Sequence, residues 1–497
     1  METKIQELKT RLAEASDLGS IGAVLHWDQS TGMPRGGGPA RARQMALVGR
    51  LAHETATDPA IGRLLDEVQP YAESLPYDDD TAALVRVARR HYERAIKVPP
   101  QFVGEMEAHA GESGMVWEKA RPENDFAATR PMLEKTLDLS RRLAEYFSPY
   151  EHIADPLIDW ADYGMTVGVI RPLFDQLRSR LVPLVEQATS REPVDDACLH
   201  AGFPEADQLK FGLQVARRIG YDFERGRLDK SAHPFTTSFS VGDVRITTQF
   251  REDDLGDALF STIHEAGHAM YEQGVDPAYE ASPLGGGTSS GVHESQSRLW
   301  ENIVGRSMDF WTHFYPKLQD VFPAQLGAVP VATYHRAINK VQRSLIRTDA
   351  DELTYNLHVM IRFGLELDML EGRLAVRDLP DAWNARYASD LGIEPPDDRD
   401  GCLQDVHWYW GAIGGQFQGY TLGNIMSAMF YRSALAAHPE IPAEMRAGRF
   451  DVLLGWLREN IYRHGSKFTA SELVQRVTGG ELTIEPYIDY LTAKYQV

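Results

Sequence analysis

Apolar residues recur along this 497-residue chain mostly three and four positions apart, which is the spacing of one face of an α-helix. The first such stripe contains Ile5, Leu8, Leu12 and Ala15. Similar stripes, interrupted by proline and glycine, continue almost to the end of the chain. They predict helices over residues 1–18, 40–68, 78–97, 99–120, 125–148, 166–188, 331–348, 349–374, 379–390, 419–437, 442–463 and 470–477.

A different pattern occupies residues 233–250, which are rich in β-branched and aromatic side chains. Gly242-Asp243 interrupts this segment and is typical of a tight turn, so the segment predicts a β-hairpin. The chain is therefore expected to be mainly α-helical, with one small β element. Because no linker of distinct composition interrupts the helical pattern, a single domain over 1–497 is favoured, with a helical N-terminal part (about 1–225) and a catalytic part (about 226–497).

Charge narrows the possible partners. The chain carries 72 acidic and 51 basic residues and a net charge of −21, which argues against nucleic acid and anionic membranes as partners. The two cysteines, Cys198 and Cys402, suggest no disulfide framework. The first residues lack the apolar segment of a signal peptide, and no apolar run is long enough to span a membrane. We expect a soluble, cytoplasmic protein.

The segment His264-Glu265-Ala266-Gly267-His268 contains the candidate metal-binding and catalytic residues. In a helix, His264 and His268 lie one turn apart on the same face, where two imidazoles can bind Zn²⁺. Glu265 then projects toward a water molecule on the metal. Because His-Glu-x-x-His also arises by chance, a hydrogen-bonded structural pair of histidines is the alternative.

A catalytic zinc site needs a third protein ligand and an open position for water. Glu294 follows His268 by 26 residues, which leaves room for a loop and a returning helix, and it is the preferred candidate. His293 and Glu272 are the competitors. Zinc lowers the pKa of bound water from about 9 toward about 7, so Glu265 can take the proton as the water attacks a peptide carbonyl. The tetrahedral oxyanion needs a further donor from another segment.

Several separated motifs occur along the chain: Leu25-His26-Trp27-Asp28-Gln29 with Met33-Pro34, His233-Pro234-Phe235, Asp243-x-Arg245-x-Thr247, His264-Glu265-x-x-His268, His293-Glu294-Ser295-Gln296, Ile346-Arg347-x-x-Ala350-Asp351 and Gly401-x-x-Gln404-Asp405-x-His407-Trp408. Together they resemble the motifs of the carboxypeptidase Taq family of zinc metallocarboxypeptidases. They occur in the family's order and span nearly the whole chain.

This resemblance implies a helical fold with a deep active-site groove and zinc at its floor, the N-terminal part forming a wall or lid. It implies a homodimer that releases single residues, with broad specificity, from peptides with a free C-terminus. His264, His268 and Glu294 would be the ligands and Glu265 the general base. Co²⁺ can replace Zn²⁺ in such an enzyme.

A carboxypeptidase must also recognise a terminal carboxylate, which suits the fork of an arginine guanidinium. Arg347, expected in a helix, is the first candidate and Arg245 the second; the alternatives are ion pairs with Asp351 and Asp243. Tyr420 is the candidate oxyanion donor, although a core tyrosine would also fit. His407 would donate to the substrate or be satisfied by Asp405. His233 would line the groove or cap a strand.

Two other functions compete with the metallocarboxypeptidase. A zinc endo-oligopeptidase or dipeptidyl carboxypeptidase would use the same motif without requiring single-residue release. A catalytically inactive, zinc-stabilised scaffold would not need Glu265, because structural zinc sites close their fourth position.

Overall fold

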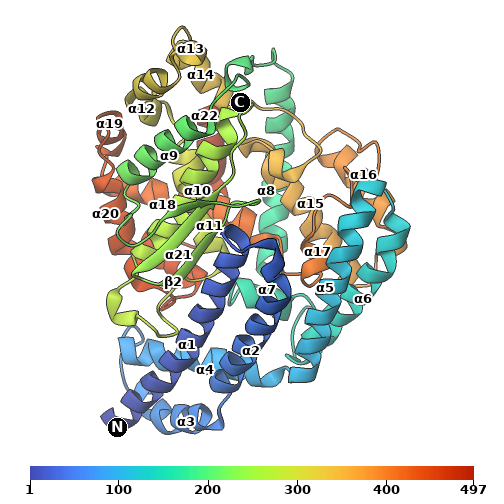
Figure 1. Ribbon diagram of the computed structural model, residues 1–497, viewed down its shortest axis with the longest axis vertical. Coiled ribbons are helices and arrows are strands. Elements are labelled where there is room, and N and C mark those ends of the chain that lie inside the picture. The colour runs from blue at the N-terminus through green and yellow to red at the C-terminus, as the bar shows by residue number, and fades with distance from the viewer. Residues whose placement is uncertain (497) are drawn as a thin grey trace.

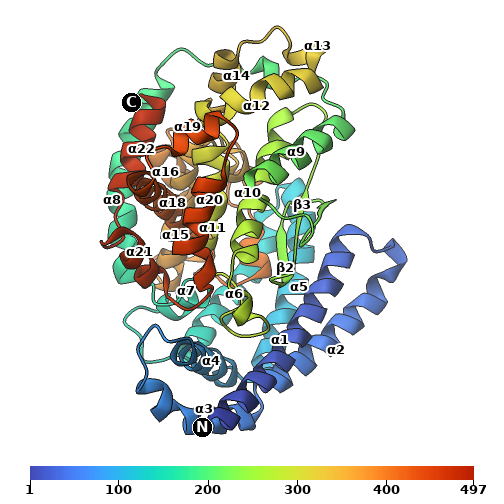
Figure 2. The ribbon, with the colours of Figure 1, turned by 90° about the vertical axis from the view of Figure 1, so that its left-hand side faces the viewer.

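In a computed structural model, residues 1–496 form a helical body with one three-stranded sheet (Figures 1 and 2). The N-terminal helices are α1 (Glu2–Thr31), α2 (Gly38–Ala56), α3 (Pro59–Glu73), α4 (Asp80–Lys97), α5 (Pro100–Glu123), α6 (Phe126–Glu145), α7 (Asp155–Ala161), α8 (Val167–Thr189) and α9 (Glu205–Ile219). Figure 2 shows α1 and α2 as a hairpin that extends from the sheet side of the body. The expectation of a mainly α-helical fold is confirmed.

The remaining elements surround the His-Glu-x-x-His segment. They are β1 (Leu228–Lys230), β2 (Thr236–Ser240), β3 (Asp243–Thr248), α10 (Leu255–Gln273), α11 (Ser290–Arg298), a π-helix (Leu299–Val304), α12 (Met308–Val321), α13 (Pro323–Leu326), α14 (Val331–Ile338), α15 (Glu352–Leu370), α16 (Leu379–Asp390), α17 (His407–Trp410), α18 (Gln418–Ala437), α19 (Ile441–Arg446), α20 (Asp451–Asn460), α21 (Ala470–Thr478) and α22 (Glu485–Tyr495). Within residues 1–496, no helix is long and apolar enough to cross a membrane.

The sheet has the order β1-β3-β2. β2 and β3 form the antiparallel hairpin that the sequence predicts, with Thr236 opposite Ile246. β1 pairs in parallel with β3 and was not predicted, because three residues are too few to show an alternating pattern. The central strand buries Val244 and Ile246 in the core that also contains α10, so the sheet is fixed beside the His-Glu-x-x-His helix.

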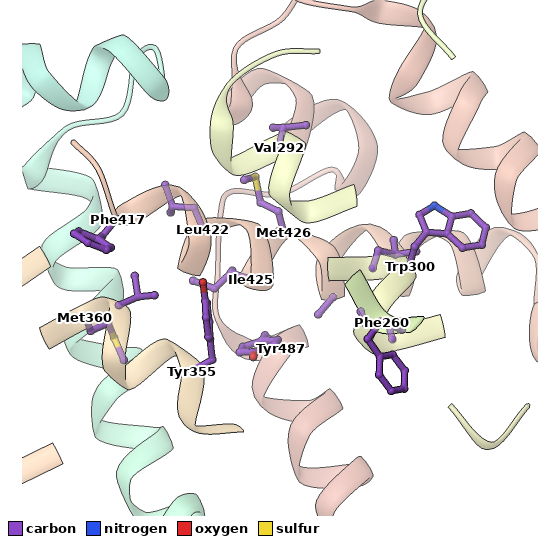
Figure 3. Close-up of a cluster of buried hydrophobic side chains, with 14 of the residues drawn as sticks. Phe260, Val292, Trp300, Tyr355, Met360, Phe417, Leu422, Ile425, Met426 and Tyr487 are labelled. Carbon is purple, nitrogen blue, oxygen red and sulfur yellow. The ribbon is translucent and has the colours of Figure 1, made fainter. Parts of the chain in front are cut away.

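Helices α10, α11 and α18 form the centre of the body. Asp254 caps α10 by accepting hydrogen bonds from the backbone N–H groups of Gly256 and Asp257. Figure 3 shows Val292 of α11 packed beside Leu422 and Met426 of α18. This close packing matters for the site because α10 and α11 carry the candidate metal ligands.

Several predicted helix boundaries were wrong. The helix expected over 331–348 ends at Ile338, where the Asn339 amide donates to the carbonyls of His335 and Arg306. Residues 40–68 and 442–463 each form two helices, and Pro70 lies inside α3 instead of ending it. Helix α9 was missed, although its buried Phe211, Val215 and Ile219 have helical spacing.

Candidate metal centre and substrate pocket

Three side chains from two helices converge on one point. Helix α10 places His264 and His268 one turn apart, and α11 brings Glu294 against them. The Nε2 atoms of His264 and His268 lie 3.7 and 3.4 Å from Oε2 of Glu294, and the three ligand atoms lie within 4.8 Å of one another. Two imidazoles and a carboxylate so arranged could hold a divalent metal ion.

The Nδ1 atoms of His264 and His268, which face away from this point, contact other side chains. His264 Nδ1 lies 2.9 Å from Oε2 of Glu301. His268 Nδ1 lies 2.8 Å from Nδ1 of His293, whose Nε2 lies 2.6 Å from Oε1 of Glu272. These contacts hold both rings with Nε2 directed toward the common point, as metal-ligating histidines require. The two competing ligands, His293 and Glu272, therefore support His268 from behind and do not join the convergent group.

Glu294 is anchored by an arginine on its own helix. Arg298 Nε donates to Glu294 Oε1 at 2.7 Å, and Arg298 Nη1 donates to Glu301 at 3.1 Å. Burial alone would raise the pKa of Glu294, but Arg298 and His264 together lower it below its usual range. Burial would also raise the pKa of Glu301, but Arg298 lowers it to about 2. Both carboxylates are thus held ionised.

We call the charged groups here the metal-side cluster: Glu265, Glu272, Glu294, Glu301, Arg298 and Arg306. Its four carboxylates and two guanidinium groups leave two formal negative charges around the histidines. A buried excess charge is costly unless it is paired. Because a divalent cation would neutralise this excess, the charge balance fits the donor set.

Two glycines allow the three helices to approach. A Cβ on Gly423 of α18 would lie 2.6 Å from Cβ and Cγ of Glu294. A Cβ on Gly267, inside the motif, would lie 2.7 Å from Cα of Ser297. Any larger residue at either position would push Glu294 away from the histidines.

Glu265 faces the sheet side of the centre. Its Oε2 accepts a hydrogen bond from Thr236 Oγ1 at 2.6 Å, and the same hydroxyl contacts the Glu265 carbonyl at 3.0 Å. Within residues 1–496, Oε1 of Glu265 accepts no hydrogen bond. The edge strand β2 therefore orients one carboxylate oxygen and leaves the other available.

A pocket of about 790 Å³ opens beside the centre and includes His268 and Glu294 in its lining. Helices α5, α6 and α7 form one wall, and α18 with the preceding glycine-containing loop forms the other. Apart from His268, His293 and Glu294, the lining residues are uncharged: Met106, Leu143, Leu157, Trp160, Ala161, Gly287, Ser289, Ser290, Ala412, Gly414, Gly415, Gln416, Gly419 and Tyr420.

Arg347 does not lie in a helix as expected but in a short 3-10 turn, Arg347–Asp349. It pairs with Asp405, not with Asp351: its Nη2 donates to Asp405 Oδ1 at 2.6 Å. The fully buried Arg362 donates to Oδ2 of the same carboxylate. We call Arg347, Arg362 and Asp405 the Asp405 cluster. Two guanidinium groups share one carboxylate, so the cluster keeps one formal positive charge.

His407 and Tyr420 lie between the Asp405 cluster and the pocket. The guanidinium carbon of Arg347 is 5.3 Å from the centre of the Tyr420 ring, and His407 Nε2 is 3.3 Å from the Tyr420 hydroxyl. Burial, reinforced by Arg347, lowers the pKa of His407 to about 4, so its ring is neutral near pH 7. Its Nδ1 is 3.6 Å from Asp405 and has no hydrogen-bond partner within residues 1–496. Asp405 thus does not satisfy His407 Nδ1, and the other ring nitrogen, Nε2, contacts the Tyr420 hydroxyl.

The other two candidates lie on the sheet side. Arg245 of β3 forms a bidentate pair with Asp243, with distances of 2.8 and 2.7 Å. Its guanidinium carbon lies 4.8 Å from the centre of the Phe239 ring. His233 is exposed, and its carbonyl accepts a hydrogen bond from Ser231. Neither side chain belongs to the pocket lining.

Comparisons with known proteins show the family of the chain. Residues 7–495 match the family model for the carboxypeptidase Taq (M32) metallopeptidases. The chain belongs to this family. It is 41% identical to thermostable carboxypeptidase 1 of Thermus thermophilus, over 99% of this chain and 98% of that one. Carboxypeptidase 1 of Bacillus subtilis is 37% identical over 95% and 94%.

A solved relative shares the fold closely. The M32 carboxypeptidase of Deinococcus radiodurans R1 superposes with a TM-score of 0.96, at 51% identity, over 99% of both chains. The protein is thus a metallocarboxypeptidase, as the motifs led us to expect. Membership of an M32 metallopeptidase family implies a divalent metal, and His264, His268 and Glu294 could bind it.

Sequence reasoning missed several residues that support the site of this M32 carboxypeptidase. Glu301 was not singled out, although Glu294, Arg298 and Glu301 follow one another at helical intervals. Arg362 was missed because nothing in the sequence links it to Asp405, 43 residues away. Met106 and Trp160 also line the pocket, yet they come from distant helices with no motif of their own.

Proposed function

We propose that this metallocarboxypeptidase is a zinc enzyme that releases single amino acids from the C-terminus of peptides, with broad specificity. The observation that carries the proposal is the convergence of His264, His268 and Glu294 within a buried cluster of excess negative charge. Two histidines and a glutamate form a donor set typical of catalytic zinc. The resemblance to the family and the largely uncharged pocket support broad specificity.

When bound, the metal would polarise the scissile carbonyl and acidify a water molecule. Glu265 is the proposed general base: its free Oε1 takes the proton of the attacking water and returns it to the leaving amine. Thr236 holds the other oxygen, so the carboxylate does not rotate away from the reacting atoms. Replacing Glu265 with Gln should remove most of the turnover while leaving the metal content unchanged.

Tyr420 is the proposed oxyanion donor, because the residue lines the pocket and burial raises the pKa of its hydroxyl above the ordinary value. A tyrosine that stays protonated can donate throughout the reaction. His407 lies 3.3 Å from that hydroxyl and can orient it or donate to the substrate itself. We propose that both act on the substrate carbonyl.

For the terminal carboxylate we propose Arg347 first and Arg245 second. The excess positive charge of the Asp405 cluster favours an anion near Tyr420, which supports Arg347. Arg245 is neutralised by Asp243 and would have to exchange that partner for the substrate. We propose that His233 contacts the substrate farther from the scissile bond, at the exposed start of the hairpin.

The alternatives are an endo-oligopeptidase and a dipeptidyl carboxypeptidase. Mass spectrometry of products from one peptide, prepared with a free and with an amidated C-terminus, separates them. We expect single residues to leave the free peptide and the amide to resist cleavage. Dipeptide products or rapid cleavage of the amidated peptide would contradict the proposal.

Further properties rest on the resemblance to the family. We propose that Co²⁺ sustains activity in place of Zn²⁺, that residues 1–497 form one metallocarboxypeptidase domain, and that the enzyme is a homodimer. Two unpaired cysteines support a reducing cytoplasmic location. Metal reconstitution of the stripped enzyme tests the first point, and light scattering coupled to size exclusion tests the dimer.

A further inference from the structure

Asp162 is a fully buried carboxylate at the point where the walls of the pocket meet. It directly follows α7, whose Leu157, Trp160 and Ala161 line one side of the pocket. Within residues 1–496, no cation lies within ion-pair distance of it. An ionisable group buried without an opposite charge is rare unless hydrogen bonds compensate for the lost solvation.

Three hydrogen bonds from two other elements converge on this carboxylate. Oδ1 accepts the backbone N–H of Gly291 at 2.7 Å, and Oδ2 accepts Ser290 Oγ at 3.0 Å and Gln418 Nε2 at 2.9 Å. Ser290 and Gly291 begin α11, and Gln418 begins α18. The partial positive charge of the α11 N-terminus also favours an anion there.

The residues around Asp162 are closely packed. A Cβ on Gly291 would lie 3.1 Å from Asp162 Oδ1, and a Cβ on Gly419 would lie 2.3 Å from Ser290 Oγ. Gln418 also donates to the carbonyl of Gly415, which belongs to the loop at the other side of the pocket. Asp162 therefore connects the end of α7 with the starts of α11 and α18, and Gln418 extends this connection to the loop.

The elements that Asp162 joins carry the groups of the proposed mechanism. Glu294 lies one helical turn after Ser290, and Tyr420 lies two residues after Gln418. We infer that Asp162 is a positioning residue of the active site, which fixes the starts of α11 and α18 and thereby sets the place of Glu294 and Tyr420. This inference rests on the proposed roles of those two residues.

The test is the zinc affinity of Asp162→Asn, measured on the full-length, metal-stripped enzyme by competition with a chromophoric chelator. The introduced amide turns one acceptor into a donor facing Gln418 Nε2 and Ser290, so α11 shifts. We expect zinc to bind about 10- to 100-fold more weakly, the range typical when the supports of metal ligands are lost. Unchanged affinity would overturn the inference.

Asp390→Asn is the matched control. Asp390 is also a buried carboxylate, but it accepts hydrogen bonds from Arg178 of α8 and from Ser389 of α16, away from the pocket lining. We expect this variant to melt at a lower temperature and to keep its zinc affinity. An equal loss of zinc affinity in both variants would show general destabilisation and overturn the inference.

A double variant, Asp162→Asn with Gln418→Glu, reverses donor and acceptor across this contact. It should recover at least part of the zinc affinity, which a purely structural defect would not do; no recovery counts against the inference. If Asp162→Asn does not fold, Gln418→Met removes one donor without exposing a charge, and an unchanged zinc affinity would again overturn it.

Glu294→Ala separates this inference from the proposed function. If that variant binds zinc normally, the ligand assignment itself has failed. If Glu294→Ala loses zinc whereas Asp162→Asn retains full affinity, only the positioning role of Asp162 has failed.

Discussion

The metal-side cluster and the Asp405 cluster are both buried networks of carboxylates and guanidinium groups, yet their excess charges have opposite signs. The first has four carboxylates for two arginines, and the second has two arginines for one carboxylate. A buried network needs external compensation for whichever charge is in excess. The first therefore suits a divalent cation, and the second suits an anion such as a peptide carboxylate.

The two clusters also differ in how they are built. The metal-side cluster comes mostly from α10, α11 and the π-helix that continues α11, so its geometry depends on local helix spacing. The Asp405 cluster joins a turn, α15 and the segment before α17, which only the tertiary fold brings together. Removal of a single C-terminal residue needs both: rigid groups at the reacting atoms and a separate site for the chain end.

The largest effect should come from Glu265→Gln, which removes the proposed base without altering the Thr236 contact. We expect kcat to fall by about 10²- to 10⁴-fold, the usual contribution of general acid–base catalysis. Metal content, measured by atomic emission, should stay the same. Substantial residual turnover would show that Glu265 is not the general base.

Arg347→Lys tests whether the Asp405 cluster binds the chain end. Lysine keeps the charge but loses the bidentate fork, so kcat/KM for free peptides should fall about 100-fold. The slow cleavage of an amidated peptide should change little. Arg245→Lys is the matched control, with a smaller expected loss. If free and amidated peptides lost rate equally, Arg347 would have only a structural role.

Glu366 extends the comparison because it is a buried carboxyl that forms no ion pair within residues 1–496. Burial raises its pKa to about 8, whereas the paired carboxylates of both clusters have lowered pKa values. Between its ordinary value of 4.5 and about 8, the unfolded chain loses a proton that the folded protein keeps. Stability should therefore fall as the pH rises through this range.

Glu366→Gln should remove this dependence, because the amide oxygen can still accept the 2.8 Å hydrogen bond from Trp408 Nε1. At pH 7 we expect an increase of roughly 3 kcal/mol in the free energy of unfolding. Denaturant titrations at pH 5, 7 and 8.5 measure it. The two proteins should differ least at pH 5, and a constant difference would contradict the assigned ionisation.

Smaller effects should come from Glu301→Gln, which weakens the contact that supports His264 without removing a metal ligand. We expect zinc affinity to drop by about tenfold, near the lower end for such partners. Glu272→Gln acts through His293 and should cost less. If Glu272→Gln lost more zinc affinity than Glu301→Gln, the proposal that Glu301 is the more important support of the two histidines would be wrong.

Much of the fold and the centre of the site follow from the sequence. Helical periodicity predicted most helices, and turn residues predicted the hairpin, because these signals are local. The i, i+4 spacing placed His264 and His268 on one face, and the 26-residue interval made Glu294 the preferred third ligand while leaving His293 and Glu272 as competitors. Boundaries failed where a distant partner decided them, as at Asn339, whose amide bonds to Arg306.

By itself the sequence determined the helical class, the His-Glu-x-x-His register and the family, since each depends on spacing along the chain. Only the tertiary structure decided that Arg347 pairs with Asp405, that His293 supports His268, and that Asp162 joins three elements. These contacts connect residues 25 to 129 positions apart. No local preference encodes them: they follow from how the helices pack, which brings the charged partners within reach of one another.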